Sequence, residues 1–179
     1  MSKPMNDFII QSWAIEGYVF NTLAEDRRRE IIQAHNQLLL TYLSVESLVQ
    51  FVQVVSGGLP RFMKGLDVTV AGHRPIAGGE QVRVAILALI DRIKGDKRSR
   101  RIAGFDYYWQ YLHLHPFTDG NGRSARALWL KIAGYPQENK SFLEEFHYQS
   151  LMWQDAQRAA DVKYMLPVEE DVEIPNEDD

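Results

Sequence analysis

The sequence predicts a mostly α-helical fold with one short β-hairpin. Its 179 residues, of which 45% are hydrophobic and 25% charged, are enough for one domain with its own apolar core. Apolar side chains recur every three to four residues along most of the chain, which indicates amphipathic helices. Only one segment alternates as a strand does. The chain has no cysteine, so disulfides, thiolate metal sites and a cysteine nucleophile are excluded.

Seven segments carry the helical spacing of apolar residues. They are residues 7–16, 24–43, 44–56, 81–93, 102–112, 123–133 and 141–162, the last of which is one or two helices. Some boundaries have recognisable signals. Ser44 is a good N-cap for the third segment, and Gly57 with Gly58 would end it. The sixth segment ends before Gly134 and Pro136.

Residues 66–75 break the helical pattern. Apolar and polar side chains alternate from Leu66 to Val70, and Ala71 with Gly72 supplies a turn. This pattern predicts a short hairpin.

Charge and hydropathy narrow the functional classes. Residues 168–179 hold seven acids and no base, and without them 20 bases face 17 acids, a balance near +3 instead of −4. This excess is too small for a dedicated nucleic-acid binder, and the acidic tail is expected to be disordered. The longest apolar run, residues 84–90, is too short to cross a bilayer, and residues 1–10 lack a signal-peptide pattern. We therefore expect a cytoplasmic protein that binds neither membrane nor nucleic acid.

The most informative segment is residues 115–126, His-Pro-Phe-Thr-Asp-Gly-Asn-Gly-Arg-Ser-Ala-Arg. Pro116 ends the preceding helix near Leu114. Gly120 and Gly122 let the backbone turn sharply before a helix begins at about Gly122. The first N–H groups of a helix have no partner within it, and its dipole is positive there, so this turn suits phosphate groups.

Four side chains in this segment add to the phosphate site. Arg123 and Arg126 lie one turn apart and supply fixed positive charge. Asp119 could hold Mg²⁺, which takes one or two carboxylates together with phosphates. Histidine is the residue type whose unperturbed pKa lies near neutrality, so His115 is the natural general base. No nucleophile is evident, so the pattern indicates transfer of a phosphorus-centred group from a nucleotide to a hydroxyl of another molecule.

Residues 115–126 resemble the Fic signature in full, His-Pro-Phe-x-x-Gly-Asn-Gly-Arg-x-x-Arg. The resemblance covers about residues 44–160 and extends to the N-terminal helix. Fic proteins typically transfer AMP from ATP to a Ser, Thr or Tyr hydroxyl of a target protein and release pyrophosphate. The resemblance therefore implies a protein adenylyltransferase with ATP as co-substrate, Mg²⁺ as cofactor and a protein with an exposed hydroxyl as partner. Its Fic catalytic domain would occupy residues 23–167.

The resemblance also implies a role for each residue of the motif. His115 would deprotonate the target hydroxyl, Asp119 would bind Mg²⁺, and Phe117 would anchor the loop in the core. Asn121 and the amides near Gly120 and Gly122 would hold the α-phosphate. Arg123 would hold the β-phosphate, and Arg126 the γ-phosphate. Asp119 and Gly122 also match the AMP-transferring branch of the family better than the Doc-type kinase branch.

A second motif lies near the N-terminus, in Ser12-Trp-Ala-Ile-Glu-Gly17. On a helix, Ser12 and Glu16 fall on the apolar, inward face. A buried carboxylate needs a partner, and Arg126 can supply it. The segment resembles the family's inhibitory motif, Ser/Thr-x-x-x-Glu-Gly/Asn, in the class where the inhibitory helix precedes the catalytic domain in the same chain. The resemblance implies that residues 1–22 restrain the enzyme, because Glu16 denies Arg126 to the γ-phosphate.

Two further assignments rest on weaker patterns. The hairpin is expected to act as a flap that takes the target segment as an added strand, through Val68, Thr69 and Val70. The adenine pocket is assigned to Tyr148, Leu151 and Met152.

Several alternatives stay open at this point. The donor can be another nucleotide, such as UTP, GTP or CDP-choline, because the loop contacts phosphates and not the base. Glu16 can position a water that removes AMP from a modified protein. A nucleotide-sensing interaction module without activity is the non-enzymatic alternative, although a base and a metal ligand are not needed for binding alone. Formation of a homo-oligomer could regulate release of the restraint.

Overall fold

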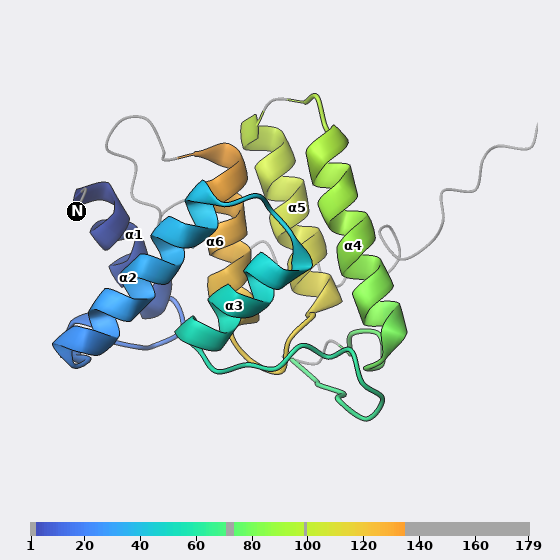
Figure 1. Ribbon diagram of the computed structural model, residues 1–179, viewed down its shortest axis with the longest axis horizontal. Coiled ribbons are helices and arrows are strands. Elements are labelled where there is room, and N and C mark those ends of the chain that lie inside the picture. Colours follow the sequence, from blue (N-terminus) through green and yellow to red (C-terminus); the bar gives the residue numbers. More distant parts are fainter. Residues whose placement is uncertain (1–2, 71–73, 99, 135–179) are drawn as a thin grey trace, which may run out of the picture. The chain divides into compact units, whose positions relative to one another are not determined.

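Six α-helices and one short 3₁₀-helix make up the part of the chain that the computed structural model describes, residues 3–70, 74–98 and 100–134 (Figure 1). They are α1 (Lys3–Ala14), η1 (Phe20–Thr22), α2 (Glu25–Leu40), α3 (Val45–Val55), α4 (Glu80–Gly95), α5 (Arg100–Leu114) and α6 (Asn121–Ala133). The predicted mostly helical fold is confirmed. The helix expected at residues 141–162 and the acidic tail at 168–179 lie outside the described residues.

Local sequence signals explain several helix boundaries. α3 begins after Ser44, whose Oγ accepts the Ser47 N–H at 3.1 Å, while Ser47 Oγ accepts the Ser44 N–H at 3.0 Å. This reciprocal pair is a capping box. α5 ends at Leu114, before the proline of the motif, and α6 begins after Gly120, which adopts the left-handed conformation at φ +77°.

The end of α1 differs from the expected helix over residues 7–16. The helix ends at Ala14, because the N–H groups of Gly17 and Tyr18 turn back onto its last carbonyls at 3.0 and 3.1 Å. Gly17 has φ +79°, as the glycine of a Schellman motif does. Glu16 therefore lies at the C-cap of α1 and not within the helix.

The hairpin expected at residues 66–75 is not seen. Residues 66–70 and 74–75 belong to no helix or strand, and the expected turn at residues 71–73 lies outside the described residues. The carbonyls of Leu66 and Ile76 accept hydrogen bonds from the side chain of Arg61. The hairpin stays a prediction.

Helix α6 lies in the interior, in contact with α1, α2, α3 and α5 (Figure 1). Its residues from Arg123 to Leu130 are all buried. Near its end, Lys131 Nζ donates to the carbonyls of Leu38 and Thr41 at 2.8 and 2.6 Å and so caps α2. α6 thereby places the motif residues that it carries among four other helices.

Helix α4 contains the longest apolar run of the chain. Val82, Ile86 and Leu89 are buried, whereas Val84 and Leu87 are exposed. The described residues contain no helix with both the length and the apolar character needed to cross a membrane.

Candidate active site

His115 occupies an uncommon backbone conformation at the end of α5. Its φ is +48°, in the left-handed region, which non-glycine residues rarely adopt. Its N–H still donates to Tyr111 O at 3.0 Å, and its Nδ1 lies 3.3 Å from Leu112 O. Because a carbonyl only accepts, this contact assigns the ring proton to Nδ1 and the lone pair to Nε2.

Backbone pairing fixes the loop that follows His115. Two backbone hydrogen bonds of 2.9 Å join residues 59–61 to residues 116–118, and Pro60 faces Phe117 in an antiparallel bridge. The Phe117 side chain is fully buried, as the resemblance implied. The side chain of Asn121 also clamps Phe117, since its Oδ1 accepts the Phe117 N–H at 3.0 Å and its Nδ2 donates to the Phe117 carbonyl at 2.8 Å. In this structure the Asn121 side chain therefore shapes the loop.

Close packing fixes the turn into α6. A Cβ on Gly120 would lie 2.9 Å from Ser56 Cβ, and one on Gly58 would lie 2.9 Å from the carbonyl carbon of Asp119. Ser124 N–H donates to Gly120 O at 2.9 Å and so closes the first turn of α6. The backbone of α3's end and the motif loop approach too closely for any side chain at Gly58 or Gly120.

Arg123 is held by groups from three segments. Only 5% of it is exposed, and its Nη1 donates to Val55 O, at the end of α3, at 2.9 Å. Asp119 Oδ1 lies 3.6 Å from its Nη2. Its guanidinium carbon lies 5.0 Å from the ring centre of Trp13 and 5.4 Å from that of Tyr18. Both distances are typical of cation–π contacts.

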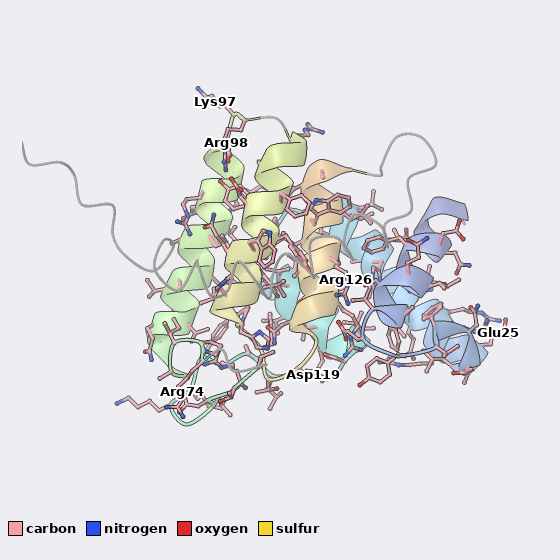
Figure 2. All side chains as sticks on the ribbon, turned by 180° about the vertical axis from the view of Figure 1, so that it is seen from behind. Glu25, Arg74, Lys97, Arg98, Asp119 and Arg126 are labelled. Atoms are coloured by element: carbon pink, nitrogen blue, oxygen red, sulfur yellow. The ribbon has the colours of Figure 1, made fainter. Side chains whose placement is uncertain are left out.

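Arg126 is held mainly by the N-terminal segment. It is 3% exposed. Its Nε donates to Ser12 Oγ at 2.7 Å, and its Nη2 donates to Ser12 O at 2.8 Å and to Glu16 Oε1. Figure 2 shows Asp119 at the turn before α6 and Arg126 further along that helix, on the side of α1. The hydroxyl, the carbonyl and the carboxylate together surround one guanidinium.

Glu16 contacts both arginines of the motif. One carboxylate oxygen accepts from Arg126, and the other, Oε2, lies 2.9 Å from Arg123 Nε. The second contact is an ion pair whose angle does not make a hydrogen bond, so Arg123 Nε stays without a hydrogen-bond acceptor. The carboxylate also lies over Gly122, where a Cβ would be 2.5 Å from Oε1. The Glu16 side chain is 25% exposed.

Buried groups around Arg126 are held in their neutral forms. Burial raises the pKa of Tyr108, an effect that the neighbouring Arg126 opposes. Burial also lowers the pKa of His35 to about 4; the Ile31 carbonyl opposes this shift and Arg126 adds to it. Glu16 therefore supplies negative charge to a cationic cluster with neutral neighbours.

Asp119 fits a metal that arrives with phosphates. Its side chain is 63% exposed, and its Oδ1 accepts the Gly120 N–H at 2.6 Å. Within the described residues, no three His, Asp or Glu side chains gather as a metal cluster. One accessible carboxylate beside a phosphate site suits Mg²⁺, which usually keeps several waters and binds one or two carboxylates together with phosphates.

The structure thus brings the residues 115–126 together with Ser12 and Glu16, while Gly17 ends α1. Val68, Thr69 and Val70 lie in the loop between α3 and α4, and the assigned adenine pocket, Tyr148, Leu151 and Met152, lies outside the described residues. The ring contacts of Trp13 and Tyr18 with Arg123 were not predicted, although the position of both residues close to Glu16 was a visible signal. The contact of Arg61 with the motif was not predicted either, and no pattern in the sequence indicates it.

The comparison with protein families identifies the family to which the motif region is similar. A family model described as the Fic/DOC family matches residues 26–133. The matched region includes α2 to α6 and the whole motif, but not α1. No curated protein matches the sequence.

Proposed function

The chain belongs to the Fic/DOC family, and from this premise we propose that it is a protein adenylyltransferase. It transfers AMP from ATP to a Ser, Thr or Tyr hydroxyl of a target protein, and of itself. The observation that supports this proposal is the motif loop. A histidine directly follows the last residue of one helix, and the next helix begins six residues after it and carries two buried arginines.

The proposed reaction is a single displacement at the α-phosphorus. His115 Nε2 takes the proton of the target hydroxyl, and the hydroxyl oxygen forms a bond to the α-phosphorus. The bond between the α-phosphorus and the bridging oxygen breaks, and pyrophosphate leaves with the electron pair. The contact between Nδ1 and Leu112 O orients the ring and favours the tautomer in which Nε2 is the nitrogen that accepts a proton.

The phosphates are proposed to lie along the start of α6. The amides near Gly120, Asn121 and Gly122 bind the α-phosphate, Arg123 the β-phosphate and Arg126 the γ-phosphate. Asp119 would hold Mg²⁺, which supplies positive charge against the phosphates. Asp119 is exposed beside this turn, as that role requires.

We further propose that residues 1–22 restrain the enzyme through Glu16. The Glu16 carboxylate contacts both Arg123 and Arg126 and lies over Gly122. A γ-phosphate needs Arg126, and a carboxylate at that guanidinium both occupies it and repels the phosphate. ATP then binds poorly or in a pose unsuited to in-line attack.

Glu16→Ala tests the restraint. We expect AMP transfer, including self-labelling, to rise by about tenfold or more, because even 1.4 kcal/mol of lost competition is a factor of ten. Labelled ATP with Mg²⁺, followed by mass spectrometry of the protein alone and with cell lysate, measures it. Glu30→Ala is the matched control, since it removes an exposed Glu–Arg pair on α2 without touching the site. Equal or lower labelling by folded Glu16→Ala would exclude the restraint.

His115→Ala tests the general base. In the Glu16→Ala background we expect transfer to fall by about 10²–10⁴-fold, the usual contribution of a positioned base. ATP binding, measured by calorimetry, should stay, because His115 lies before the phosphate-binding turn. Transfer that survives the substitution would assign the base to another residue.

A second activity is supported by one observation. The Glu16 carboxylate lies at the phosphate-binding turn, where it can orient a water toward an AMP-modified side chain. Incubation of the unmodified protein with AMP-labelled target measures this hydrolysis. A nucleotide panel with Glu16→Ala decides the donor, and binding without turnover of any nucleotide would indicate a sensing module instead.

A further inference from the structure

Arg61 is a fully buried charged residue outside the motif. It lies between α3 and α4, and none of its surface is exposed. A buried guanidinium is costly unless its donors are satisfied, so its hydrogen bonds indicate what it is for. Burial lowers its pKa, and the neighbouring Asp67 carboxylate opposes this shift.

The side-chain donors of Arg61 reach carbonyl groups at the start of the motif loop and in the α3–α4 loop. Nη1 donates to His115 O at 2.6 Å and, more weakly, to Leu114 O at 3.5 Å. Nε donates to Leu66 O at 2.7 Å, and Nη2 donates to Ile76 O. One side chain therefore joins the carbonyl of the proposed base to two carbonyls of the α3–α4 loop.

The bond to His115 O matters because of the backbone conformation there. At φ +48° a non-glycine residue is strained and persists only where its surroundings enforce it. The N–H of Arg61 also donates to Pro116 O at 2.9 Å. Arg61 thus binds the carbonyl of His115 through its side chain and the carbonyl of Pro116 through its backbone N–H.

The other two bonds lie at the two ends of the proposed flap. Leu66 and Ile76 bracket Val68, Thr69 and Val70, the residues assigned to the target. Both ends of that segment therefore meet at the same guanidinium that holds His115.

We propose that Arg61 is a positioning residue, which holds the imidazole of His115 in register with the flap that presents the target hydroxyl. This inference rests on the proposed transfer reaction, in which the hydroxyl must lie within hydrogen-bond reach of His115. A planar guanidinium with its donors in a fixed fork can satisfy carbonyls in several directions at once, whereas a lysine ammonium cannot reproduce that fork.

Arg61→Lys in the Glu16→Ala background tests the proposal. We expect kcat to fall by about 100-fold, the effect of a reacting group displaced by about 1 Å, while the KM for ATP stays unchanged. Rates are measured on whichever target the Glu16→Ala protein labels. Lys131→Met is the control for lost stability, because it removes the partly buried cap of α2 far along α6 and should lower Tm with kcat unchanged. Equal losses of kcat in both variants, or an unchanged kcat in Arg61→Lys, would overturn the proposal.

A spectroscopic measurement separates this proposal from the proposed function. The ¹⁵N signals of the His115 ring, assigned by comparison with His115→Ala, should shift toward a mixture of tautomers in Arg61→Lys. This readout needs no turnover. The ring signals can shift in Arg61→Lys even though the Glu16→Ala protein shows no AMP transfer. In that case the transferase assignment fails and the positioning role stands. Unchanged ring signals overturn the positioning role even if transfer is observed.

Hydrogen exchange of the Arg61 guanidinium can be measured in the unsubstituted protein, so this test does not require any variant to fold. The guanidinium protons of Arg61 should exchange with solvent much more slowly than those of Arg83, an exposed arginine on α4. Exchange as fast as that of Arg83 would show that the guanidinium is not held, and would overturn the proposal.

Discussion

At the scale of single residues, the candidate site is organised by arginines whose partners come from distant parts of the chain. Arg126 receives its hydroxyl, carbonyl and carboxylate partners from residues 12 and 16, more than a hundred positions away. The donor in these hydrogen bonds is charged, and hydrogen bonds of this kind are stronger than those between neutral groups. Ser12 is therefore more than a marker of the motif, because its Oγ and its carbonyl both hold the guanidinium.

Ser12→Ala should weaken this attachment without abolishing it. The hydrogen bond from Arg126 Nε at 2.7 Å is lost, and a buried bond to a charged group is worth about 1.5–3 kcal/mol of unfolding free energy. AMP transfer should rise less than in Glu16→Ala, because Glu16 and the Ser12 carbonyl remain. Urea unfolding and self-labelling measure the two effects. Thr22→Ala, which removes an exposed hydroxyl bond, is the control; equal stability of the two variants would contradict the role of Ser12.

At the scale of elements, the position of Glu16 depends on how α1 ends. Gly17 at φ +79° terminates the helix, and this leaves Glu16 at the C-cap with its carboxylate on Arg123 and Arg126. A Cβ on Gly17 would meet nothing within 4 Å, so its requirement is conformational and not steric. The glycine after Glu16 therefore has a local structural role, which is to end α1.

Two substitutions of Gly17 test whether its role depends on the left-handed backbone conformation or on the space around it. Gly17→Ala places a residue with a Cβ in the left-handed region, which costs about 1–2 kcal/mol, whereas Gly17→Asn costs less because asparagine tolerates that region. We expect a lower Tm and greater self-labelling for Gly17→Ala, with Gly17→Asn between it and the unsubstituted protein. Equal labelling by all three proteins would show that the restraint by Glu16 does not depend on how α1 ends.

The sequence predicted the elements better than their contacts. Helical spacing and the cap at Ser44 depend on neighbours in the chain, so α2 to α6 lie close to their expected positions. The true end of α1 was missed, because Ile15 and Glu16 continue a helical pattern that Gly17 then stops. The burial of Arg61 could not be predicted, since its acceptors at Leu66, Ile76 and His115 come together only in the folded chain.

At the scale of the whole molecule, α6 joins the site to the core. The same helix carries Arg123 and Arg126 and packs against four other helices. Behind Arg126 lies His35, buried between the rings of Phe8 and Phe51. Stability of the core and charge at the site are therefore linked through one buried imidazole.

This link predicts acid sensitivity. His35 has a pKa of about 4 when folded, because of burial, and 6.5 when unfolded. Between these values the unfolded chain binds a proton that the folded protein does not, so the free energy of unfolding falls as pH falls through that window. From pH 7 to pH 5 this residue alone should remove about 2 kcal/mol. Urea unfolding at both pH values measures it, and His35→Gln should lose this part of the pH dependence; an unchanged slope would contradict the assignment.

The two guanidinium groups differ in what remains if α1 moves away. Arg123 keeps its bond to Val55 O and its neighbour Asp119, whereas Arg126 loses the hydroxyl, carbonyl and carboxylate that now orient it. Without α1, Arg123 would therefore keep two of its partners, whereas Arg126 would keep the neighbouring Tyr108 hydroxyl of α5. Under the proposed restraint, the Glu16 carboxylate at Arg126 would therefore weaken the binding of a triphosphate more than that of a diphosphate, and departure of α1 would remove this difference.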